Sequence, residues 1–181
     1  MIKIKIFNPL VGKNRISFQG FIAMRHMLRD YSIDITESDD FDYAFLGADD
    51  ILNKSIGLQE SIEYGLENID KYARGGDCFI FDGSDSTSLM GSYEVLEQSD
   101  AKFLFKNQTL KNREDYKEKT SFNKWFFGNG SGLDLGYDIS EENWGRIKLS
   151  GWNLGYMAPQ GFRPQVQKWH PPNPNKTIDL S

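Results

Sequence analysis

Residues 78–88 read CFIFDGSDSTS and carry the clearest indication of the fold. A short apolar run ends in a polar turn that contains glycine, and a helical pattern follows at once. The order strand, polar loop, helix is typical of open α/β sheets, which bind ligands in the crevice beyond the carboxyl ends of their strands. The stretch therefore predicts a parallel sheet and also the edge of that sheet at which a ligand binds.

The rest of residues 1–110 alternates apolar runs with helical patterns in the same way. This alternation favours parallel strands joined by right-handed crossovers, with helices on both faces of the sheet. We therefore predict an α/β fold with a Rossmann-like open parallel sheet, whose fourth strand is buried on both faces. The expected strands are 2–7, 32–36, 41–46, 77–81 and 101–105, and the expected helices are 18–31, 58–74 and 88–99.

Composition narrows the class of protein. Charged residues make up 26% of the chain and hydrophobic residues 39%, as in globular proteins. The net charge of −5 gives no support for a nucleic-acid partner, which needs a clustered basic face. No apolar run approaches the roughly 18 residues of a membrane span. The chain starts with a strand pattern rather than a signal peptide, and its single cysteine rules out an internal disulfide. We therefore expect a cytoplasmic protein.

The last third of the chain has a different character. Residues 111–170 are rich in aromatic residues and glycine without clear periodicity, which predicts an irregular cap packed on the core. Within this cap, residues 147–149 could add a strand. Residues 171–181 read PPNPNKTIDLS, where the proline-rich part predicts an extended linker and the last residues read as the start of a missing second domain.

Polar residues gather at the expected carboxyl edge of the sheet. Hydroxyl and backbone N–H groups at the start of a helix suit sugar hydroxyls or an anion. The parallel topology also brings the residues after the third and fifth strands to this edge. The candidate substrate-binding residues are Asp82, Gly83, Ser84, Asp85, Ser86, Thr87, Lys106, Asn107 and Asp49.

A simpler role remains open for each of these residues. Asp85, Ser86 or Ser88 alone would be enough to cap the following helix, and Asp49 could cap a helix of its own. Lys106 and Asn107 could be solvated residues at the end of a strand. The aromatic residues of the cap, which could stack on sugar rings, could equally pack in a core.

Known catalytic motifs fit this sequence poorly. Asp82 and Asp85 are one residue too far apart for the Asp-x-Asp of haloacid-dehalogenase-type phosphotransfer, and no glycine-rich loop carries the lysine of a phosphate-binding P-loop. The chain has only two histidines, so neither a zinc site nor a Ser-His-Asp triad can be assigned. We therefore predict no metal site and assign no catalytic residue.

Four short segments nevertheless resemble a known group of proteins. They are DGSDSTSL at residues 82–89, GSYEV at 91–95, AKFLFKNQ at 101–108 and LSGWNLGY at 149–156. Together they look like the N-terminal half of bacterial and viral glycosyltransferase-like proteins with two Rossmann domains, the GT-B architecture. The final KTIDLS, residues 176–181, resembles the first strand of the second domain in that architecture.

This resemblance implies a function for the chain. In the GT-B architecture the N-terminal domain mainly contacts the acceptor, the C-terminal domain binds most of the nucleotide-sugar, and catalysis takes place between them. The expected partners are a glycan or small sugar acceptor and a second Rossmann domain, which would bring the nucleotide-sugar donor. The alternative is a stand-alone Rossmann-like binding or virion-associated module without catalytic activity.

Overall fold

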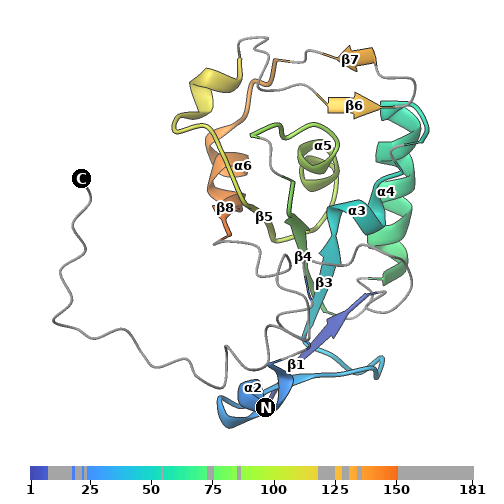
Figure 1. Cartoon of the computed structure of the whole chain (residues 1–181), viewed down its shortest axis with the longest axis vertical. Coiled ribbons are helices and arrows are strands. Elements are labelled where there is room, and N and C mark those ends of the chain that lie inside the picture. The colour runs from blue at the N-terminus through green and yellow to red at the C-terminus, as the bar shows by residue number, and fades with distance from the viewer. Residues whose placement is uncertain are drawn as a thin grey trace, which may run out of the picture.

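The computed structural model describes residues 1–7, 18, 22, 24–53, 55–72, 76–84, 87–117, 125–127, 131–133 and 136–150. A six-stranded sheet with the order β2-β1-β3-β4-β5-β8 forms its centre (Figure 1). Every neighbouring pair in this sheet is parallel, which confirms the predicted α/β fold with a Rossmann-like open sheet. The strands are β1 (Ile2–Ile6), β2 (Ile33–Ile35), β3 (Tyr43–Gly47), β4 (Asp77–Asp82), β5 (Phe103–Lys106) and β8 (Ile147–Leu149).

Helices and short elements connect these strands. The helices are α2 (Arg25–Asp30), α3 (Ala48–Ile51), α4 (Leu58–Tyr72), α5 (Ser92–Glu97), the 3₁₀ helix η1 (Arg113–Tyr116) and α6 (Glu141–Arg146). A separate antiparallel pair consists of β6 (Trp125–Phe127) and β7 (Ser131–Leu133).

None of the described helices is long and apolar enough to cross a membrane. The predicted linker and second-domain start at residues 171–181 lie outside the described residues.

The helix after β4 is shorter than predicted. The sequence suggests a helix over residues 88–99, but α5 begins at Ser92. Its N-cap, Gly91, has a φ of 83°, a left-handed conformation that side chains other than glycine rarely adopt. The Gly91 N–H donates to the Glu94 carboxylate at 2.6 Å, as in one half of a capping box. Residues 87–91 therefore extend the loop that leaves the carboxyl end of β4.

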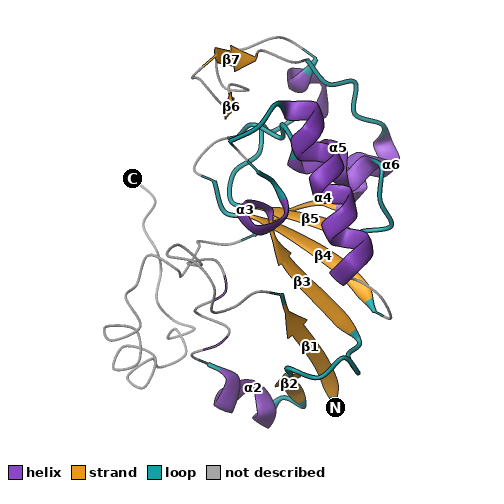
Figure 2. Cartoon of the chain, turned by 90° about the vertical axis from the view of Figure 1, so that its right-hand side faces the viewer, coloured by secondary structure: helices purple, strands orange, loops and turns teal. Residues whose placement is uncertain are grey.

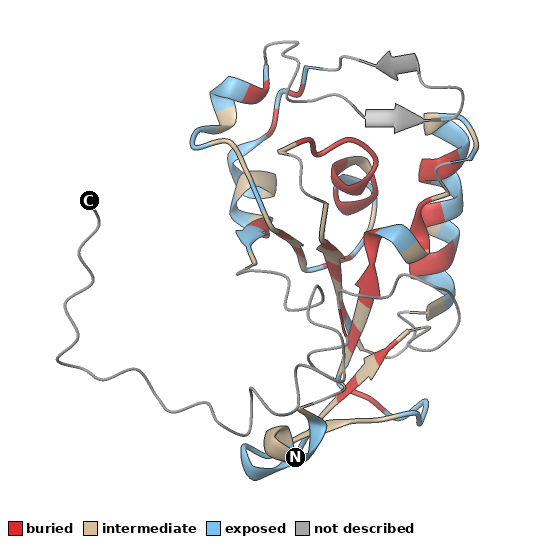
Figure 3. Cartoon of the chain, in the orientation of Figure 1, coloured by how far each residue is buried: buried red, intermediate tan, exposed pale blue. Residues whose placement is uncertain are grey.

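One face of the sheet carries the main hydrophobic core. Ala44, Ile80 and Leu104 from the central strands are fully buried there against helices α4 and α5. Figure 2 shows α4, α5 and α6 together on this side of the sheet, and Figure 3 shows the buried residues concentrated between these elements. β8 joins the sheet beside β5 through Ile147, so the sheet includes residues beyond 1–110.

The opposite face of the sheet is aromatic and only partly covered. Ile4 and Ile6 are buried there beneath the helical residue Phe18. The prediction that the fourth strand is buried on both faces is wrong for this side, because Phe79 and Phe81 stay partly exposed. Ring stacking replaces full burial: the Phe81 ring lies 4.9 Å from that of Phe105, at an angle of 17°. The aromatic rings of this face are Tyr43, Phe45, Phe79, Phe81, Phe103 and Phe105.

Arg146 joins helix α6 to the core. Its Nη2 donates to the carbonyl oxygen of Leu96 in the last turn of α5 at 2.8 Å, and to those of Ser99 and Ala101, in the segment that leads to β5, at 3.1 Å and 2.6 Å. The last carbonyls of a helix have no partner within the helix, so a cationic donor there supplies missing hydrogen bonds and a favourable charge. Arg146 therefore anchors α6 just before the chain enters β8.

Helices α4 and α5 approach each other closely because residue 65 is glycine. A Cβ at Gly65 would lie 2.8 Å from Cγ2 of Val95 and 3.3 Å from the carbonyl oxygen of Ile51. Val95 is completely buried, so it has little room to move away.

We predict that Gly65→Ala destabilises the fold by about 1–3 kcal/mol, the usual cost of overpacking a core. This loss should exceed the gain in helix propensity from replacing a helical glycine, which is roughly 1 kcal/mol. Urea denaturation measures the effect. In the double variant Gly65→Ala/Val95→Ala, the methyl groups removed at residue 95 make room for the new one at residue 65. The double variant should therefore lose less unfolding free energy than the sum of the losses in the two single variants. Strict additivity would contradict the predicted contact.

Candidate functional site

A buried ion pair lies at the carboxyl edge of the sheet. Asp82 is the last residue of β4 and Lys106 is the last residue of β5, and the two are paired in register. The Lys106 Nζ lies 3.0 Å from the Asp82 Oδ2. Their side chains are 0% and 2% exposed, respectively, on the side of the sheet that α5 covers. The sequence predicts both residues at this edge, but it does not predict that they are buried against each other.

Further hydrogen bonds complete the surroundings of this ion pair. The Asp82 Oδ2 also accepts from the Ser92 hydroxyl at 2.9 Å, and its Oδ1 accepts from the Ser84 backbone N–H at 3.0 Å. The Lys106 ammonium donates to the Ser84 Oγ at 2.8 Å. Buried charges remain ionised only when such partners replace water. The network therefore fixes the first residues of the loop after β4.

The charge state of Asp82 follows from this network. Burial on its own raises the pKa of the Asp82 carboxyl. The positive charge of Lys106 and the hydrogen bonds from Ser84 outweigh it, so the pKa lies below its ordinary value of 3.8. The carboxylate in turn favours the protonated form of Lys106. The pair is thus an ammonium with a carboxylate, and Lys106 is unsuited to act as a general base.

Asparagine 107 ties the neighbouring loops together. Its backbone N–H donates to the Asp82 carbonyl at 3.3 Å, and its Nδ2 donates to the Gly83 carbonyl at 3.1 Å. Its Oδ1 accepts from the Ser150 hydroxyl at 2.9 Å. The loops after β4, β5 and β8 therefore converge at one edge, as expected for the ends of neighbouring parallel strands.

The far end of the loop after β4 is held by tyrosines from the C-terminal third of the chain. The fully buried Tyr116 donates its hydroxyl to the Thr87 carbonyl at 2.9 Å and accepts from the Leu110 N–H at 2.9 Å. Burial raises the pKa of Tyr116 to about 12, so the phenol stays protonated and remains a donor. Tyr137 adds a second contact, because its hydroxyl donates to Glu94, the residue that binds the Gly91 N–H.

The structure brings most of the predicted site residues to one place. Asp82, Gly83, Ser84, Lys106 and Asn107 are linked by the hydrogen bonds described above. Thr87 lies where the same loop meets Tyr116. Asp85 and Ser86 lie outside the described residues, so their proposed role stays a prediction.

Two of the simpler roles can be compared with the structure. Ser88 does not cap α5, because the N-cap is Gly91, and the Ser88 Oγ accepts from the Met90 N–H at 3.3 Å instead. Asp49 lies in the first turn of the short helix α3, directly after β3, and it is exposed. The N-cap of α3 is Gly47, so Asp49 does not cap this helix, although a carboxylate in a first helical turn is favourable in itself. The binding role of Asp49 stays a prediction.

Three polar residues of this site were missed by the sequence reasoning. Ser92 falls inside the expected helix 88–99, and Tyr116 falls in the irregular cap expected at residues 111–170, so neither pattern indicates a site residue. Ser150 could have been found, because it directly follows residues 147–149, an expected strand, and strand ends mark this edge. Among the described residues, no group of three or more His, Cys, Asp or Glu side chains is placed to hold a metal ion.

The chain was compared with protein-family models, with curated proteins and with solved structures, and none of them matches it.

The buried pair generates a prediction on stability. Lys106→Met should destabilise the protein by about 3–5 kcal/mol, because it leaves a buried carboxylate without its counter-charge. Asp82→Asn should be destabilising as well, since the ammonium of Lys106 then lacks its partner. In urea denaturation, the double variant should lose less stability than the sum of the two single losses. Additive losses would contradict a direct interaction between the two side chains.

The lowered pKa of Asp82 gives a pH dependence. A carboxyl whose pKa is lower in the folded state stabilises the fold at pH values above its unfolded pKa, and this contribution is lost as the pH falls through the folded pKa. Wild-type protein should therefore lose more stability than the double variant Asp82→Asn/Lys106→Met on acidification from about pH 7 to about pH 2. Parallel stability curves for the two proteins would contradict this. Burial raises the pKa of Glu94, so this residue changes the pH dependence of stability in the opposite direction. Because both proteins contain Glu94, it does not affect the comparison.

Proposed function

We propose that this chain is the acceptor-side domain of a two-domain, GT-B-like glycosyltransferase of the cytoplasm, and that it binds a glycan or small sugar acceptor at the carboxyl edge of its sheet. A second Rossmann domain would supply the nucleotide-sugar site. The resemblance of residues 82–89 and 101–108 to such proteins suggests the class. The observation that carries the proposal is the convergence of the loops after β4 and β5 on the buried pair Asp82–Lys106.

The geometry supports a binding role for this edge in two ways. First, the crevice beyond the carboxyl ends of the strands is the place where open α/β sheets bind ligands. Second, Lys106 fixes Ser84 near the start of the loop after β4 and Tyr116 fixes Thr87, so the polar groups of these two described residues are pre-organised. A pre-organised loop loses little conformational entropy on binding, which favours recognition of a small polar ligand.

The protonation states support an acceptor-side role rather than a complete catalytic centre. Lys106 is paired with a carboxylate, and Asp82 accepts hydrogen bonds from three residues while almost fully buried. Neither group is available to remove a proton from a sugar hydroxyl. A catalytic base for transfer would then come from elsewhere, in agreement with catalysis between two domains.

The second candidate is a Rossmann-like binding module without catalytic activity. The same observation favours it, because the ionisable groups of the described site neutralise each other. The two functions differ in the donor: only the transferase hypothesis requires a nucleotide-sugar and transfer in the presence of a second domain. A transfer assay with a nucleotide-sugar, a sugar acceptor and the second Rossmann domain that the transferase hypothesis requires separates the two functions.

Saturation-transfer NMR with a panel of monosaccharides tests the proposed site. We expect a sugar to bind with a dissociation constant on the order of millimolar, which corresponds to about −4 kcal/mol. Asp85→Asn should weaken this binding severalfold and change the unfolding free energy by less than about 0.5 kcal/mol. Asp30→Asn, at an exposed position on α2, is the matched control.

Two results would contradict the proposal. Tight binding of a nucleotide-sugar by this chain alone, measured by calorimetry, would assign it to the donor side. The loop after β4 would not be a sugar-binding site if the Asp85→Asn variant bound sugar as well as the wild-type protein does. The same conclusion would follow if no sugar in the panel bound.

A further inference from the structure

Two tyrosines and two glutamates join α5 to the segment that leads into α6. Glu94 and Glu97 lie one turn apart on α5. The Tyr137 hydroxyl donates to the Glu94 Oε1 at 2.9 Å, and the Tyr93 hydroxyl donates to the Glu97 Oε1 at 2.9 Å. The two tyrosine rings meet edge to face, with their centroids 5.4 Å apart. We call these four residues the Glu94 cluster.

Glu94 makes no ion pair with a cation in the part of the chain that the structure describes. Its two oxygens accept from the Tyr137 hydroxyl and from the Gly91 N–H, at 2.9 Å and 2.6 Å, and both donors are uncharged. The charged group that acts on it most is Glu97, which carries a like charge. A carboxylate in such surroundings binds a proton more readily than an exposed one.

Basic side chains of the neighbouring segments are engaged with other groups. The pairs are Lys106 with Asp82, Lys117 with Glu114 and Asp138, and Arg146 with Asn143 and with carbonyls at and after the end of α5. Helix α4 approaches α5 where Gly65 faces Val95, and neither residue carries a charge. These elements therefore bring no positive charge to the Glu94 carboxylate.

Burial raises the pKa of the Glu94 carboxyl above its ordinary value of 4.5, and the charge of Glu97 acts in the same direction. The hydrogen bonds from Tyr137 and Gly91 favour the ionised form but do not outweigh burial. The segment 136–139 contributes to this burial, because Tyr137 contacts the carboxylate and is itself buried. When this segment leaves α5, the carboxyl is more solvated and its pKa returns towards the ordinary value.

We propose that Glu94 is a proton-binding site that controls how tightly the segment 136–139 docks on α5. A proton taken up from solvent forms one O–H bond on the carboxylate and removes the cost of burying a charge. Both contacts survive this change. The new O–H can donate to the Tyr137 oxygen, which can accept as well as donate, and the other carboxyl oxygen still accepts from the Gly91 N–H.

The direction of the effect follows from linkage. The docked state holds the proton on Glu94 more tightly than the undocked state, because its pKa is the higher of the two. The contribution of this proton to docking is therefore complete below the pKa of the undocked state and is lost as the pH rises through the pKa of the docked state. Mild acid tightens the contact, and neutral pH loosens it.

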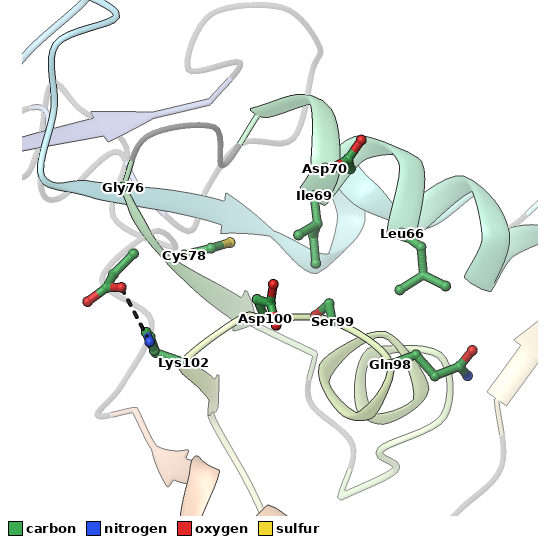
Figure 4. A pocket seen from close by; sticks show the side chains of 10 residues that line it. Leu66, Ile69, Asp70, Gly76, Cys78, Gln98, Ser99, Asp100 and Lys102 are labelled. Carbon is green, nitrogen blue, oxygen red and sulfur yellow. Dashed lines mark ion pairs between the residues drawn. The ribbon is translucent and has the colours of Figure 1, made fainter.

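The Glu94 cluster is connected to the loop after β4 but not to the hollow beyond the other end of α5. Gly91 ends that loop, and the Tyr137 N–H donates to the carbonyl of Tyr116 at 2.7 Å. The hollow, shown in Figure 4, is lined by Gln98 and Asp100 among others and by no member of the cluster. The proton on Glu94 thus acts on the support of the loop, whether or not the loop binds a sugar.

Carboxyl carbon-13 NMR of the full chain tests the proton site. Glu94 should titrate above 4.5. Tyr137→Phe removes a donor to the carboxylate and should raise this pKa further, whereas Glu97→Gln removes a like charge and should lower it. Glu67→Gln, at an exposed position on α4, is the matched control and should leave it unchanged. Titration of Glu94 in the wild-type protein at or below 4.5 would overturn the proposal, even if every variant failed to fold.

Hydrogen exchange of the Tyr137 amide measures docking, expressed at each pH as protection relative to the intrinsic rate. In the wild-type protein this protection should increase severalfold from about pH 7 to about pH 4.5. Glu94→Gln is uncharged at both pH values, so its protection should be the same at both. The amide of Ile80, in the centre of the sheet, reports global opening for comparison. Constant wild-type protection of Tyr137, or an equal increase in Glu94→Gln, would rule out control by this proton.

Discussion

The buried ion pair between Asp82 and Lys106 is the constraint on which the carboxyl edge of this protein depends. Two opposite charges inside a protein are tolerated only when each keeps enough polar partners to replace its hydration shell. Here Ser84 and Ser92 supply those partners, one from the loop and one from the first residue of α5. The position of the loop, the start of the helix and the pairing of β4 with β5 are thereby coupled to one another.

The same coupling extends into the last third of the chain. Ser150 reaches the site through Asn107, and Tyr116 reaches it through the carbonyl of Thr87. Residues that lie far apart in the sequence are thus required to hold a single loop. Segments 110–117 and 136–150 consequently act as a support for the candidate site, whatever ligand binds there.

Much of this fold could be predicted because strand signals are local. Apolar residues alternate with lysines in β1, and β3, β4 and β5 contain continuous apolar runs. The parallel topology then places Asp82 near Asn107. What could not be predicted depends on tertiary contacts. From the sequence, a lysine at the end of a strand is expected to be solvated. Lys106 is nevertheless buried, because the carboxylate of Asp82 on the neighbouring strand pairs with it. Helix α5 begins at Ser92, later than expected, because Gly91 adopts a left-handed conformation. A helical pattern in the sequence does not reveal such a conformation.

The three hydrogen bonds of Arg146 have a consequence for folding. They join α5, the turn before β5 and α6, so they couple the docking of β8 to the formation of the end of α5. Edge strands of three residues have few contacts of their own, and β8 depends on this guanidinium for its position beside β5. In native-state hydrogen exchange, the amides of β8 and α6 would therefore open as one cooperative unit, separate from β1, β3 and β4.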